Sequence, residues 1–201
     1  MEPSYFIDLS EAAQHRLLQI ARSSIAHGLV SRQPLAIEAD DLPGVLCEPV
    51  ASFVTIRHRE MLRGCVGSLD AVRPLAEAVS FAAFSAAFKD TRFPPLREDE
   101  LHVVSIEVSV LSTLEPMTVS DEQSLLDQLQ PRIDGLLLED QWHRATFLPK
   151  VWEQLAEPAD FLKALKQKAG LPPDYWSDTL RFRRYRTITF SEEQTATPAV
   201  A

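Results

Sequence analysis

A cysteine stands between two glycines in the segment Leu62-Arg63-Gly64-Cys65-Val66-Gly67. Glycine allows φ > 0 or a close approach to another group, so Gly64 and Gly67 can help to present the Cys65 thiol to a pocket. The neighbouring Arg63 favours a thiolate, because nearby positive groups stabilise that form. The segment predicts a site in which Cys65 acts as a nucleophile or thiol acceptor. The alternative is a small buried residue in a hairpin, which is how free cysteines most often behave.

Charged residues in two later segments could join this site. Asp90 and Arg92 lie one residue apart in a loop, where they either face a ligand or hold a tight turn. Glu107 lies in an otherwise apolar strand and needs a partner, because burying an unpaired charge is costly. Arg63 and Arg92 are its expected partners. If the three segments converge, Cys65, Arg63, Asp90, Arg92 and Glu107 line one polar cleft.

Metal chemistry has no comparable signal in this sequence. None of the histidines has the spacing of a zinc helix or knuckle, and we predict no metal and no cofactor. No histidine can be assigned as a base beside Cys65, so the residues leave open whether the protein is an enzyme. The histidines are His15, His27, His58, His102 and His143.

The elements that must position these residues can be predicted from apolar periodicity. Two strands at 51–56 and 61–67 are separated by a short polar break, which predicts a β-hairpin. Pro74 suits the first turn of a helix that runs through Phe88, and its apolar residues cover most of the helix circumference, which indicates burial. A proline-rich loop and a strand over 103–111 follow.

The remaining apolar pattern predicts a first helix capped by Asp8 and, after residue 120, further helices and strands. Strands come in hairpins and helices in blocks, so the predicted class is α+β, a mainly antiparallel sheet with helices packed on it and two subdomains in one compact unit. We expect one domain over 1–190 and a flexible tail over 191–201. The later elements are a helix at 124–129, a hairpin of 133–138 and 144–148, helices at 149–156 and 159–169, and a strand at 180–190.

Composition narrows the setting of the protein. The 201 residues carry a net charge of -9, which argues against general affinity for nucleic acid, although the run from Arg181 to Arg186 mixes basic and aromatic residues. Two cysteines, Cys47 and Cys65, provide neither a disulfide framework nor an iron–sulfur site. No stretch is apolar enough for a membrane span and no secretory signal is present. We therefore expect a cytoplasmic protein.

Several motifs resemble one protein family. Besides the glycine–cysteine segment, they include Ala86-Ala87-Phe88-Lys89-Asp90-Thr91-Arg92-Phe93-Pro94-Pro95, the strand ending at Glu107-Val108-Ser109-Val110-Leu111-Ser112, Asp134-Gly135-Leu136, and Ala145-Thr146-Phe147-Leu148-Pro149. Together they are similar to the AMMECR family (AMME chromosomal region gene one proteins), whose prokaryotic members are called AmmeMemoRadiSam system protein A. Lys150 and Trp152 depart from the family's usual residues.

The resemblance implies an α+β fold with two subdomains and a cleft that the glycine–cysteine segment faces, but it supplies no reaction. It also implies a modification pathway shared with a Memo-like protein and a radical-SAM protein. We expect Cys65 to be the candidate catalytic residue and Arg63, Gly64, Gly67, Asp90, Arg92 and Glu107 to bind a small-molecule or peptide ligand. A non-catalytic adaptor and a nucleic-acid-associated regulator are the competing hypotheses.

Overall fold

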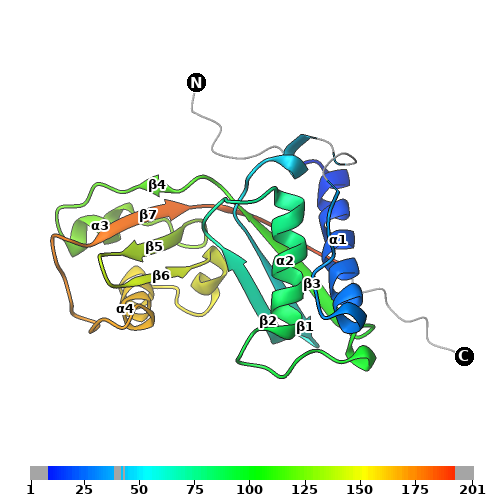
Figure 1. Ribbon diagram of the computed structural model, residues 1–201. Helices are drawn as coiled ribbons and strands as arrows, with labels where there is room; N and C mark the ends of the chain where they lie inside the picture. The colour runs from blue at the N-terminus through cyan, green and yellow to red at the C-terminus, as the bar shows by residue number, and fades with distance from the viewer. Residues whose placement is uncertain (1–8, 39–41, 43, 193–201) are drawn as a thin grey trace, which may run out of the picture. The chain divides into compact units, whose positions relative to one another are not determined.

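The computed structural model describes residues 9–38, 42 and 44–192, which fall into two compact units. The first comprises the described residues up to Leu111 together with 188–192, and the second comprises Ser112–Thr187. In the described residues, each unit is built on a four-stranded antiparallel sheet with helices (Figure 1). This confirms the α+β class predicted from the sequence.

The sheet of the first unit has the strand order β2-β1-β3-β8. Helices α1 and α2 pack against each other on this sheet, with α2 over β1 and β2 and with α1 over β3 (Figure 1). Two short 3-10 helices, η2 and η3, lie in the connections. The bounds are α1 Glu11–Ser31, η2 Gly44–Cys47, β1 Ser52–His58, β2 Met61–Ser68, α2 Leu75–Phe88, η3 Glu98–Glu100, β3 Val104–Leu111 and β8 Thr187–Ser191.

Alternation along the strands gives the first unit its core. Val54, Ile56, Ile106 and Val108 are fully buried on the face that the helices cover. Ten of the 14 residues of α2 are buried, which confirms the buried helix expected from its apolar circumference. Most of these residues are small, so the helix can lie close to the sheet.

The first helix begins at Glu11 and is capped by Ser10, whose hydroxyl accepts a hydrogen bond from the Ala13 N–H at 3.3 Å. The cap predicted at Asp8 lies outside the described residues. Every helix in the described part of the chain falls short of the length or the hydropathy needed to cross a bilayer.

The second unit has the strand order β4-β7-β5-β6. Its core contains Trp152, which stacks on Phe161 with ring centroids 3.8 Å apart and donates to the Asp134 carbonyl at 2.7 Å. The helix predicted over 149–156 is instead a 3-10 helix that ends at Glu153. The bounds are β4 Glu115–Pro116, α3 Glu122–Gln128, β5 Gly135–Glu139, β6 Arg144–Phe147, η4 Pro149–Glu153, α4 Pro158–Lys168 and β7 Arg181–Tyr185.

The single strand predicted over 180–190 is wrong, because the chain changes sheets at Arg186. Strand β7 belongs to the second sheet and β8 to the first. At the break, the Arg186 N–H donates to Ser112 Oγ at 2.9 Å, and the Arg186 carbonyl accepts from the Ser112 N–H at 2.9 Å. The connection that follows β3 therefore holds the backbone where it leaves one sheet for the other.

Strand β8 extends one residue past the predicted domain end at 190. The next residue, Glu192, forms an ion pair with Arg22 of α1 and accepts from the Ile106 N–H at 3.1 Å. These contacts tie this end of the described chain to helix α1 and to strand β3. The rest of the predicted tail lies outside the described residues.

Candidate functional site

Strand β2 carries the glycine–cysteine segment and forms one edge of the first sheet. Cys65 lies opposite Thr55 of β1, and Thr55 lies opposite Glu107 of β3. Directly opposite residues share a face, so Cys65, Thr55 and Glu107 form a row across the sheet, on the side away from α1 and α2. We call these three residues the cysteine row.

The Cys65 thiol is free, half-buried and hydrogen-bonded. Its sulfur accepts a hydrogen bond from the Thr55 hydroxyl at 3.4 Å, and the Thr55 side chain is itself buried. Glu107 is two strands away, which corresponds to about 10 Å between backbones. A group that lies between the two could therefore touch both the sulfur and the carboxylate.

Asp90 and Arg92 hold the backbone of Cys65 from the loop that follows α2. The Cys65 N–H donates to Asp90 Oδ2 at 2.9 Å, and Arg92 Nη2 donates to the Cys65 carbonyl at 3.1 Å. The two side chains also bind each other, with Arg92 Nε 2.9 Å from Asp90 Oδ1 and Arg92 Nη2 2.7 Å from Asp90 Oδ2. We call this pair the edge clip.

The edge clip satisfies the backbone groups that Cys65 turns away from β1. Unpaired groups of this kind on an edge strand otherwise face water or recruit another strand. Hydrogen bonding by Arg92 lowers the pKa of Asp90 to about 2, against an opposing effect of burial. The carboxylate is therefore charged at any ordinary cellular pH, and the clip remains closed.

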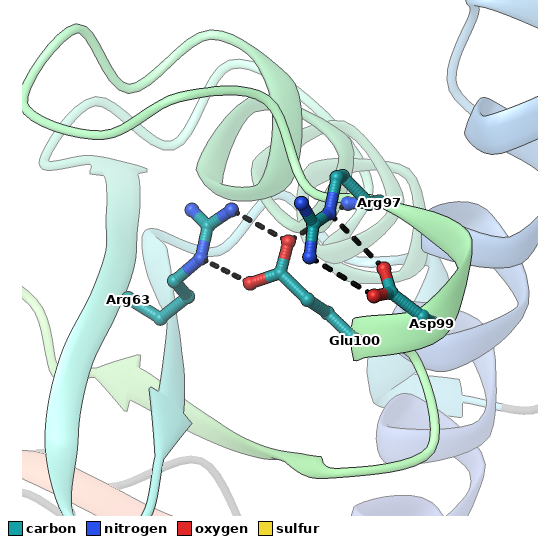
Figure 2. Close-up of polar contacts among 4 residues, drawn as sticks. All are labelled: Arg63, Arg97, Asp99 and Glu100. Atoms are coloured by element: carbon teal, nitrogen blue, oxygen red, sulfur yellow. Dashed lines mark hydrogen bonds and ion pairs between the residues drawn. The ribbon is translucent and has the colours of Figure 1, made fainter.

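Arg63 takes part in a different network. Its Nε and Nη2 donate to the two carboxylate oxygens of Glu100 at 2.7 and 3.0 Å, and the same carboxylate accepts from the Arg97 N–H (Figure 2). Arg97 in turn pairs with the exposed Asp99. The hydrogen bonds from Arg63 hold the pKa of Glu100 at about 2, despite an opposing effect of burial.

The partners expected for Glu107 are therefore engaged elsewhere, Arg63 with Glu100 and Arg92 with Asp90. Arg63 is also the extra residue of a β-bulge, since Arg57 pairs with Leu62 and Ile56 pairs with Gly64. Arg63, the positive neighbour expected beside Cys65, is thus bound to Glu100, and Arg92 is the arginine that hydrogen-bonds to Cys65.

Both glycines of the segment are within a strand rather than in a turn. A Cβ on Gly64 would lie 2.1 Å from the Ala86 carbonyl oxygen of α2, and one on Gly67 would lie 2.3 Å from the Ser52 carbonyl oxygen. Gly64 thus allows the helix to approach the sheet, and Gly67 accommodates the Phe53 ring, 2.4 Å from the same imagined Cβ. Their contacts are with protein groups, and ligand contact by either glycine stays a prediction.

The structure therefore brings Cys65, Asp90 and Arg92 into direct contact and places Glu107 on the same face as Cys65. Two residues that sequence reasoning missed complete the surroundings, Thr55 beside the sulfur and Glu100 beside Arg63. The hairpin register could have identified Thr55, but only if the bulge had been known. Among the described residues, no group of three or more histidine, cysteine, aspartate or glutamate side chains could hold a metal ion.

Comparison with known proteins gives a consistent result. The AMMECR1 family model matches residues 18–190. A protein of Methanothermobacter thermautotrophicus is 37% identical over 192 residues, covering 94% of this chain and 98% of that protein. Protein SSO0193 of Saccharolobus solfataricus is 36% identical, covering 92% of this chain and 84% of that protein. The crystal structure of the uncharacterised protein PH0010 from Pyrococcus horikoshii is similar with a TM-score of 0.81 at 32% identity, covering 88% of this chain and 90% of that one. The chain belongs to the AMMECR1 family.

Proposed function

We propose that this protein is the ligand- or substrate-binding component of a modification pathway that also involves a Memo-like and a radical-SAM protein. In this proposal the ligand binds over the cysteine row and contacts the Cys65 thiol. One observation supports this most directly. The edge clip holds both backbone groups of Cys65 at the edge of the sheet, while its thiol lies on the sheet face away from α1 and α2 and accepts a hydrogen bond from Thr55.

The row suits a polar ligand with an electrophilic centre. The hydrogen bond from the Thr55 hydroxyl holds the sulfur in one position, so that a ligand over the row meets it in a fixed orientation. Glu107 is too far along the row to be a direct base for Cys65, given two strand spacings of about 4.8 Å each. Its carboxylate is instead suited to accept hydrogen bonds from a ligand that already contacts the sulfur.

Alkylation under native conditions tests the reactivity that this role requires. We expect iodoacetamide to label Cys65 near neutral pH without denaturant, as measured by intact mass and peptide mapping. Thr55→Val keeps the side-chain volume but removes the hydroxyl, and should slow labelling about three- to tenfold. Cys47→Ser is the matched control, because it leaves Cys65 as the single thiol of the chain. Labelling of Cys65 only after denaturation would contradict the proposal.

The ligand itself can be sought in the same samples. Native mass spectrometry of the protein, alone and after incubation with the Memo-like and radical-SAM proteins, should reveal an adduct on Cys65 or a co-purified small molecule. Cys65→Ser should remove a covalent adduct while circular dichroism shows an unchanged fold. An adduct that survives this substitution would place the chemistry at another residue.

A second candidate is a non-catalytic adaptor, which the exposure of the edge clip favours. The Arg92 side chain is 55% exposed at an edge of the sheet, where a partner protein could dock. Binding to the Memo-like or radical-SAM protein that survives Cys65→Ser but is lost in Arg92→Ala would support the adaptor. Loss in Cys65→Ser alone would support the thiol site.

A nucleic-acid role receives less support from the arginines of β7. Arg183 pairs with Glu139, Arg184 pairs with Glu115, and Arg181 donates to the Asp178 carbonyl. A guanidinium that is already neutralised by a carboxylate releases few counterions from a phosphate backbone. Salt-dependent retention on immobilised nucleic acid would nevertheless restore this hypothesis.

A further inference from the structure

A pocket in the first unit lies between helix α2 and the ends of β1 and β2. Its volume is about 240 Å³. A dry cavity of about 150 Å³ accepts benzene, so this pocket has room for one aromatic ring with a short substituent. Its walls are mainly apolar and include Val50, Val66, Ala78, Phe81 and Ala82.

The Ser52 hydroxyl is the unexplained polar group of this pocket. Ser52 lines the pocket, is 2% exposed, and its Oγ has no hydrogen-bond partner among the described residues. By strand alternation its side chain lies on the same face as Val54 and Ile56, which is the face toward α2. A buried hydroxyl without a protein partner calls for a bonding group from outside the protein.

The pocket lining also includes a positive charge, on Arg73. The Arg73 Cζ is 4.5 Å from the centroid of the Phe81 ring, which is 40% exposed. A guanidinium held over a ring in this way still has N–H groups with which to bind a carboxylate. Asp70 also lines the pocket, and its negative charge offsets part of the attraction that Arg73 exerts on an anion, so one negative group on the ligand is the most that this pair favours.

We propose that this pocket binds a small aromatic monocarboxylate whose ring carries a hydrogen-bonding group. The ring lies against Phe81 and the alanines of α2, the ring substituent bonds Ser52 Oγ, and the carboxylate meets Arg73. The Cys65 side chain points to the other face of the sheet, so this site is separate from the cysteine row.

Three probes separate the parts of this ligand. The first is 3-(4-hydroxyphenyl)propionate, which has both polar groups, while 3-phenylpropionate lacks the hydroxyl and 4-ethylphenol lacks the carboxylate. Binding is followed by chemical-shift changes at the amides of Gly67, Ser68 and Ala82, all pocket residues. For a ligand of this size we expect a Kd of about 1 mM or tighter for the first probe.

Two variants assign the polar contacts. In the wild type the hydroxylated acid should bind about fivefold tighter than 3-phenylpropionate, and Ser52→Ala should abolish that difference. Arg73→Gln should weaken both acids but leave 4-ethylphenol unchanged, which also shows that the pocket is intact. Cys65→Ser should change none of these affinities, so that a failure of the thiol site is distinguishable from a failure of this one.

The opposite results would overturn the proposal. If no pocket amide shifts with about 10 mM of any probe, the cavity is not a site for this class of ligand. If the probes bind equally in wild type and both variants, the contacts are adventitious. If Ser52→Ala leaves the preference for the hydroxylated acid intact, Ser52 Oγ is satisfied by water and selects nothing.

Discussion

Asp90→Asn should destabilise the first unit by opening the edge clip. The contacts with Arg92 and the Cys65 N–H lower the pKa of Asp90 from 3.8 to about 2. A shift of that size corresponds to about 2.4 kcal/mol at neutral pH. Because 55% of the Arg92 side chain is exposed, solvent screening reduces this figure, and we expect a loss of about 1–2 kcal/mol.

Equilibrium urea unfolding measures this loss. Far-UV circular dichroism follows both units, whereas the three tryptophans, Trp142, Trp152 and Trp176, all lie in the second unit and report on it separately. Asp99→Asn is the matched control, because the Arg97–Asp99 pair is about 70% exposed on both sides and should be worth less than about 0.5 kcal/mol. Amide hydrogen exchange at Cys65 should also become faster in Asp90→Asn.

The pH dependence gives a second, independent check. A carboxyl whose folded-state pKa is lowered contributes stability above its unfolded pKa, and that contribution is lost as the pH falls through the folded value. The difference between wild type and Asp90→Asn should thus be complete near neutrality, shrink below about pH 4 and vanish near pH 2. A variant as stable as the wild type, or a difference that persists unchanged to pH 2, would refute the reasoning.

Three further predictions concern the surroundings of the site and the second unit. Glu100→Gln should cost about 2–3 kcal/mol in urea unfolding, because Arg63 is 12% exposed and would keep a buried, uncompensated charge; equal stability would contradict this. Gly64→Ala should lower stability by at least about 3 kcal/mol, since its Cβ would overlap a carbonyl oxygen of α2. Gly170→Ala is the control, because a Cβ there would meet open space and only the φ of +82° opposes it, so this variant should lose about 1 kcal/mol. Similar losses of stability for the two variants in thermal unfolding would refute the argument from the Gly64 contact. Asp134→Asn should stabilise the second unit at neutral pH, because burial raises the pKa of this carboxyl and disfavours its charged form; the gain, measured by tryptophan fluorescence, should disappear in acid as the wild-type carboxyl takes up its proton.

The first hairpin and helix α2 could be predicted because their signals are local. Strands at 51–56 and 61–67 alternate as a half-buried sheet should, and the small apolar residues after Pro74 indicate a buried helix. The row across the sheet was not predictable in the same way. The hairpin turn pairs His58 with Met61, and continuing that register would set Thr55 opposite Gly64.

The bulge at Arg63 shifts this register by one residue and brings Cys65 opposite Thr55. Nothing in the periodicity marks the extra residue, since Arg63 is anchored by Glu100, 37 residues later in the chain. The split at Arg186 is hidden for a related reason. The apolar residues on either side of it (Leu180 and Phe182, then Ile188 and Phe190) are in phase with a single strand, and the contact that divides the strand comes from Ser112.

Strand β8 also has a consequence for synthesis of the protein on the ribosome. The first unit is interrupted by the whole second unit, because residues 112–187 are made between β3 and β8. During translation, one edge of β3 therefore stays unpaired until β8 emerges. By then α1, α2 and the β1–β2 hairpin have already been synthesised. The contact between Arg22 and Glu192, 170 residues apart, forms among the last. A chaperone that shields the open side of β3 would act in this interval, and a stalled or truncated chain would expose the same edge to aggregation.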